Sequence, residues 1–94
     1  MNDYEVMFII NATLEDEQKE AAIEMVKEII SAEGELGEVD VWGTRKLAYP
    51  IEKMSEGYYV VIQFKAKSDL PKELDRRLKI SDSIIRHIIV NKEK

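Results

Sequence analysis

The order in which the hydrophobic period changes along the chain constrains its fold more than any other feature. Residues 4–10 alternate with the period of two that is typical of a strand, and residues 38–49, 58–67 and 84–90 are also predicted strands. One segment of helical period follows the first strand and another follows the third. The 94 residues therefore have the order β-α-β-β-α-β, which predicts a single domain over residues 1–94.

The two helical segments have recognisable ends. Thr13 is the predicted N-cap of the first helix, and Gly34 is its predicted C-terminal stop. The apolar stripe of this helix consists of Ala22, Met25, Val26, Ile29 and Ile30. Ser68 or Asp69 caps the second helix and Pro71 fits its first turn. Its apolar face consists of Leu70, Leu74 and Leu78.

The second predicted strand is irregular. Its alternation breaks at Trp42-Gly43, which predicts a bulge or bend. Pro50 cannot donate a ladder hydrogen bond, so this strand lies at an edge of the sheet or ends there. Residues 53–57 are the predicted turn that leads into the third strand.

Two βαβ halves joined by a hairpin predict a ferredoxin-like α+β fold, a split β-α-β arrangement. In it, a four-stranded antiparallel sheet carries both helices on one face, with the first and third strands in the centre. The other face stays open and carries Glu5, Met7, Ile9, Tyr59, Val61, Gln63 and Lys65. An exposed apolar cluster of Met7, Ile9, Tyr59 and Val61 predicts a face for a protein partner. The alternative is that these are ordinary scattered surface residues.

The net charge of −5 conceals a division along the chain. Residues 1–40 hold twelve acidic residues and two lysines, a sum of −10, whereas residues 41–94 hold seven acidic and twelve basic residues, a sum of +5. Such asymmetry is one indication of a nucleic-acid face. Two solvated helices of opposite sign would explain it equally well.

Signatures of enzymes are missing from the sequence. There is no cysteine, and the one histidine, His87, has no second histidine or carboxylate at metal-ligand spacing. No serine lies in a Gly-x-Ser-x-Gly setting, and the four glycines are too dispersed for a phosphate loop. We therefore expect a binding protein without catalytic residues, metal, cofactor or small-molecule substrate. No apolar run could span a membrane and no basic flank opens a secretion signal, so we expect a cytoplasmic location.

The most specific motif is the block Gly-x-Arg-x-Leu-Ala-Tyr-x-Ile over residues 43–51. With the opening Tyr4-Glu5-Val6, the later Gly57-Tyr58 and the closing strand, it resembles the bacterial ribosomal protein family S-six of the small subunit. The resemblance covers nearly the whole chain. It implies a ribonucleoprotein component of translation that binds the central domain of small-subunit ribosomal RNA. It also implies that the chain binds jointly with ribosomal protein eighteen of the same subunit.

On this interpretation the basic residues of the later strands contact phosphates and 2′-hydroxyls. The predicted RNA-binding residues are Arg45, Lys46, Lys53, Arg86, His87 and Lys92. The predicted protein-partner residues are Met7, Ile9, Tyr59 and Val61. A different class of function also fits the fold: a regulatory or small-ligand-binding domain that forms homodimers through its open sheet face.

Overall fold

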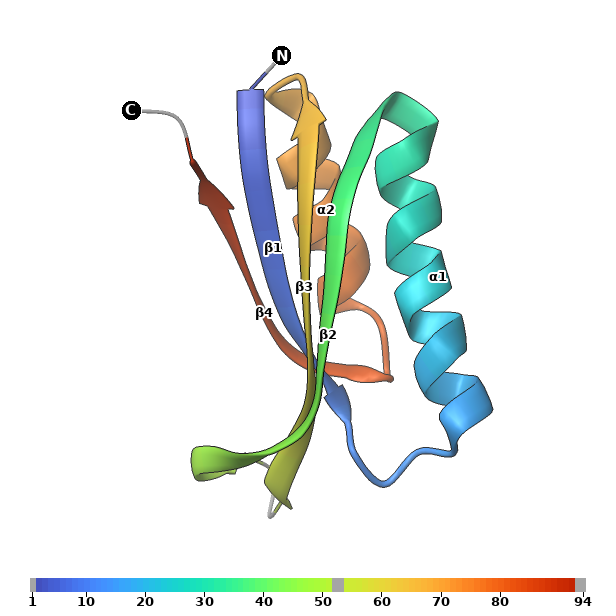
Figure 1. The fold of residues 1–94 in the computed structure, drawn as a ribbon, viewed down its shortest axis with the longest axis vertical. Helices are drawn as coiled ribbons and strands as arrows, with labels where there is room; N and C mark the ends of the chain where they lie inside the picture. Colours follow the sequence, from blue (N-terminus) through green and yellow to red (C-terminus); the bar gives the residue numbers. More distant parts are fainter. Residues whose placement is uncertain (1, 52–53, 93–94) are drawn as a thin grey trace.

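Two helices cover one face of a four-stranded antiparallel sheet and leave the other face open (Figure 1). The computed structural model describes residues 2–51 and 54–92. Its elements are β1 (Asn2–Asn11), α1 (Asp16–Glu33), β2 (Gly34–Ile51), β3 (Met54–Ala66), α2 (Asp69–Lys79) and β4 (Ile84–Asn91). The strand order is β2-β3-β1-β4, so β1 and β3 are central. The predicted ferredoxin-like fold and the predicted edge position of β2 are confirmed.

The core lies between the helices and one face of the sheet. Alternate residues of the two central strands point into it, including Val6, Phe8, Val60 and Ile62, all with no solvent exposure. Their helical counterparts are Ala22, Ile23, Val26, Ile30, Leu70, Leu74 and Leu78. The period of two in the strands and of 3.6 in the helices thus places each apolar set in one shared interior. Within the described residues, no helix has the length and apolar character needed to cross a membrane.

The first helix begins later than predicted. Its N-cap is Glu15 rather than Thr13, and the backbone N–H of Glu15 donates to Oε1 of Gln18 at 3.2 Å. The hydroxyl of Thr13 instead donates to Oδ1 of Asn11 at 2.7 Å, within the loop before the helix. Thr13 thus stabilises the loop between β1 and α1. Glu15 and Gln18 instead cap the N-terminus of the helix. Gly34 follows the helix as predicted.

The β2–β3 hairpin is longer than predicted. Strand β2 starts directly after α1, where Gly34 pairs with Ala66, and Ile51 pairs with Met54 at the far end. The predicted turn over residues 53–57 is therefore wrong, because residues 54–57 belong to β3. Strand β1 ends at Asn11, opposite Gly57, so the hairpin continues past the four-stranded part. Figure 1 shows this extension curving away from α1.

The predicted bulge in β2 is confirmed. Val41 pairs with Val60 and Gly43 pairs with Tyr59, which leaves Trp42 as an extra residue between them. Gly43 has a φ of 82°, a backbone conformation that glycine adopts without steric cost. The bulge matters for the open face, because it turns the side chain of Trp42 toward it.

Candidate functional site

The apolar side chains at the centre of the open face are less exposed to solvent than the sequence suggested. Ile9 and Val61 do face away from the helices, but only 6% of Ile9 and 8% of Val61 is exposed. Their neighbours explain this: Ile9 lies between its cross-strand partners Tyr59 and Arg86, and long side chains on both sides shield it. The prediction that all four partner-face residues are exposed is therefore wrong for these two. Met7 and Tyr59 are partly exposed.

The exposed apolar side chains of this face lie on the two edge strands instead. Strand β2 contributes Trp42, which is 43% exposed. Strand β4 contributes Ile88 and Val90, which are 44% and 47% exposed. The cross-strand partners of Ile88 and Val90 are Met7 and Glu5, which fixes them on the open face. Sequence reasoning missed these three residues. The break in alternation at Trp42 was the one available signal.

Trp42 is held rigidly although it is exposed. Its ring stacks on Tyr59 with a centroid separation of 6.2 Å and an interplanar angle of 10°. Its Nε1–H donates to Oδ2 of Asp40 at 3.0 Å. Such an offset stack with a satisfied indole donor fixes both side-chain torsions of the tryptophan. The result is a flat aromatic surface at the β2 edge.

Three of the predicted RNA-binding residues lie on the open face. Arg45 is opposite Gly57 on the hairpin side, and Arg86 is opposite Ile9 on β4. Nζ of Lys92 donates to Oε1 of Gln63 at 3.3 Å, which draws this side chain over the open face from the β4 edge. Arg45 and Arg86 are on opposite edges of the sheet, with β3 and β1 between them. Basic and apolar side chains therefore share one surface.

A depression of about 380 Å³ lies beside Lys92 at the far end of this face. Besides lysine and glutamine side chains it includes the carboxylates of Asp3 and Glu38. The positive charge of Lys92 is consequently offset in part by neighbouring carboxylates. Among residues 2–51 and 54–92, no His, Asp and Glu side chains form a group of three or more that could hold a metal ion.

The other predicted RNA-binding residues are not on this face. Lys46 is opposite Glu56 and follows Arg45, so it points to the helical side of the sheet. His87 is opposite Phe8, again on the helical side, and only 11% of its side chain is exposed. Its Nε2 is 2.6 Å from Oδ1 of Asp75 in α2. His87 thus links β4 to α2, on the side of the sheet away from Arg45 and Arg86. Lys53 lies outside the described residues.

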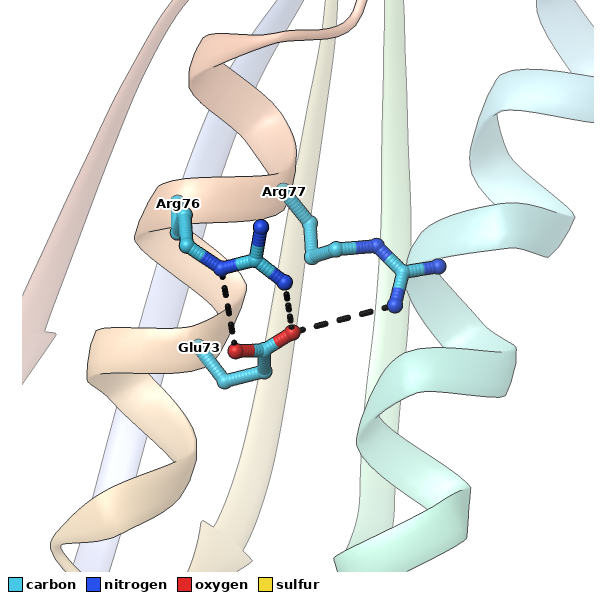
Figure 2. Close-up of polar contacts among 3 residues, drawn as sticks. All are labelled: Glu73, Arg76 and Arg77. Atoms are coloured by element: carbon cyan, nitrogen blue, oxygen red, sulfur yellow. Dashed lines mark hydrogen bonds and ion pairs between the residues drawn. The ribbon is translucent and has the colours of Figure 1, made fainter.

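Much of the positive charge of α2 is neutralised within the helix itself. Figure 2 shows Glu73 between two arginines: its carboxylate is 2.6 Å from Nη2 of Arg76 and 3.8 Å from Nη1 of Arg77. The hydrogen bond from Arg76 lowers the pKa of the Glu73 carboxyl and raises the pKa of the Arg76 guanidinium. These exposed pairs support the interpretation of α2 as a solvated helix.

A second carboxylate of α2 is engaged in the same way. The hydrogen bond from His87 and, next, that from Lys79 lower the pKa of the Asp75 carboxyl. Nζ of Lys79 is 3.1 Å from Oδ2 of Asp75. Several of the twelve basic residues in residues 41–94 are therefore already paired with carboxylates of the chain itself.

Comparisons with known proteins agree with this architecture. A family model described as Ribosomal protein S6 matches residues 3–91. The chain is 48% identical over 90 residues to small ribosomal subunit protein bS6 of Clostridioides difficile strain 630, covering 96% of this chain and 98% of the relative. It is 52% identical over 95 residues to the protein of the same name from Clostridium novyi, which covers both chains completely.

A solved structure extends the match to three dimensions. The crystal structure of 30S ribosomal protein S6 from Thermotoga maritima superposes with a TM-score of 0.92 at 35% identity, covering 97% of this chain and 87% of that one. These relatives are all named as proteins of the small ribosomal subunit. With matching sequence over nearly its whole length and matching architecture, this chain belongs to the ribosomal protein S6 family.

Proposed function

We propose that this chain binds small-subunit ribosomal RNA together with ribosomal protein eighteen of the same subunit, and that both contacts use the open face of its sheet. Membership of a ribosomal protein family supports a place in the small subunit, in the cytoplasm. The observation that carries the proposal is the mixture on this face. Arg45 and Arg86 lie among the exposed apolar side chains Trp42, Ile88 and Val90.

Each half of this mixture suits one of the two partners. The planar guanidinium of arginine donates two parallel hydrogen bonds to a phosphate, which makes Arg45 and Arg86 the favoured RNA contacts. Covering exposed apolar side chains with another polypeptide favours binding by about 25 cal/mol per Å² of apolar surface buried, before ordering costs are subtracted. A face that carries both kinds of group fits a joint complex better than either partner alone.

The charge of the chain makes the protein partner necessary for strong RNA binding. The net charge is −5, and several cations of α2 are already paired with carboxylates. Long-range attraction between this chain and a polyanion is therefore weak. We infer that ribosomal protein eighteen supplies much of the positive field, while this chain supplies a rigid platform and a few directed contacts.

A filter-binding titration with central-domain ribosomal RNA tests this proposal, in the presence and absence of ribosomal protein eighteen. Arg45→Ala should weaken binding by the joint complex and reduce the dependence of log K on log salt by about 0.7–0.9. Lys46→Ala is the matched control, because the neighbouring side chain points to the helical side of the sheet. Equal losses from both variants, or strong salt-sensitive binding by this chain alone, would contradict the proposal.

Self-association is the competing use of the same face. Ile88 and Val90 are exposed on the edge strand β4, where a second copy could dock. Sedimentation of the purified chain separates the two functions. A monomer that forms a 1:1 complex with ribosomal protein eighteen supports the proposal, whereas a stable homodimer that excludes this protein favours the alternative.

A further inference from the structure

We propose that the stacked pair Trp42–Tyr59, with the carboxylate of Asp40 beside it, is the point at which the protein partner docks. The partner segment that fits here presents a basic side chain together with an apolar one. This inference deepens the proposed function and rests on it. It names an anchor that, apart from Tyr59, lies outside the partner residues predicted from the sequence.

The first argument is preorganisation. Trp42 leaves the ladder at the bulge, stacks on Tyr59 at 6.2 Å and donates its Nε1–H to Asp40 at 3.0 Å. The free chain has thus already lost most of the torsional freedom of this ring, yet 43% of the residue is exposed. Binding that buries it costs little further ordering. Rigid aromatic residues of this kind are enriched among the few side chains that dominate interface energies.

The second argument is charge complementarity along β2. On the open face the strand carries Glu35, Glu38 and Asp40 before the bulge and Arg45 after it. Phosphates are repelled from the acidic segment and attracted to the basic one, so RNA and protein are directed to different parts of the same strand. A basic polypeptide is the occupant that the acidic segment favours.

The third argument is the chemistry offered at the anchor itself. The outer face of the indole ring attracts an arginine or lysine cation by its quadrupole. The carboxylate of Asp40, which already accepts one hydrogen bond from Trp42, has further lone pairs for a charge-assisted bond. Val61, opposite Asp40, extends the apolar floor toward the centre of the sheet. A cation and an apolar side chain from one segment would satisfy both features.

Titration calorimetry of the full chain with purified ribosomal protein eighteen tests the anchor. Trp42→Ala should weaken partner binding about 10- to 100-fold. Trp42→Phe, which keeps a stacking ring, should recover part of this loss. Asp40→Asn keeps an oxygen acceptor but removes the charge, so it should weaken binding and reduce its salt dependence. Val41→Ala is the matched control: Val41 is 46% exposed and opposite Val60, on the helical side.

The outcomes separate this inference from the function on which it rests. If the wild-type chain and Trp42→Ala bind the partner with the same dissociation constant, the anchor is overturned and the proposed function stays intact. Failure of the wild-type chain to bind the partner at all would overturn both. A Trp42→Ala variant that keeps its affinity for the partner but weakens RNA binding by the joint complex would show that the anchor takes a base instead, and would also overturn the inference.

A direct spectroscopic readout is available because Trp42 is the one tryptophan of the chain. The protein labelled with fluorotryptophan gives a single ¹⁹F resonance, whatever tryptophans the partner contains. This resonance should shift on addition of ribosomal protein eighteen and stay unchanged on addition of RNA alone. A resonance that moves only with RNA would refute the assignment.

Discussion

Gly57 provides a sharp test of how the hairpin packs on the open face. A β-carbon at this position would collide with Cγ2 of Ile9 and would approach Cδ2 of Leu47 to 3.2 Å. Among the described glycines only Gly43 has a positive φ, so alanine at position 57 would be strained by lack of space rather than by its backbone conformation. Gly57→Ala is therefore a clean steric perturbation.

The expected magnitude follows from overpacking. Forcing one methyl group into a filled site lowers the free energy of unfolding by about 1–3 kcal/mol. For a domain of this size each kcal/mol lowers Tm by about 4–8 °C. Ile9→Ala alone should cost about 2–5 kcal/mol, because it empties a buried site. In the double variant the colliding methyl group is gone, so Gly57→Ala should then cost much less than it does alone.

Urea denaturation of the four proteins, followed by far-ultraviolet circular dichroism, measures this cycle. Gly43→Ala is the control, because no atom lies within 4 Å of its β-carbon position but its φ is 82°. Its cost of about 1–2 kcal/mol comes from the backbone and should persist in the Ile9→Ala background. Costs for Gly57→Ala and Ile9→Ala that add within about 0.5 kcal/mol would refute the steric reasoning.

Two further predictions concern the helical layer. Asp75 has a lowered pKa in the folded chain, so its contribution to stability is present above the unfolded pKa and is lost as pH falls through the folded one. Asp75→Asn should therefore lower Tm near neutral pH. The curves of Tm against pH for the wild-type chain and the variant should converge below about pH 4. Parallel curves would contradict this prediction. Leu74→Ala should lower the free energy of unfolding by about 2–5 kcal/mol, since Leu74 is fully buried in the core. A loss below 1 kcal/mol in urea denaturation would mean that neighbouring side chains refill the space, contrary to close packing.

Which side of the sheet each central residue faces could be predicted from the sequence. A period of two sends Val6 and Phe8 to one side and Met7 and Ile9 to the other, whatever the rest of the chain does. The edge position of β2 followed from Pro50 and from the order of the elements. These features depend on local geometry and topology, which one sequence contains.

How deeply a side chain is buried on the open face could not be predicted in the same way. The exposure of Ile9 depends on Tyr59 and Arg86 from two other strands and on Leu47 from the curved hairpin. The place of His87 was ambiguous for another reason, because β4 carries isoleucines on both faces and its alternation favours neither. Only the register opposite Phe8 assigns this histidine to α2 and Asp75.

The pairing of β1 with β4 has a consequence for synthesis of the polypeptide. Tyr4 pairs with Asn91, so the sheet joins residues that are among the most distant in sequence. During translation β1 can pair with β3 early, but its second ladder stays unfilled until residues 84–91 have left the exit tunnel. Until then the nascent chain exposes the unpaired backbone N–H and C=O groups of β1 and the side of α2 that β4 later covers. We expect holding chaperones to recognise this intermediate rather than the finished domain.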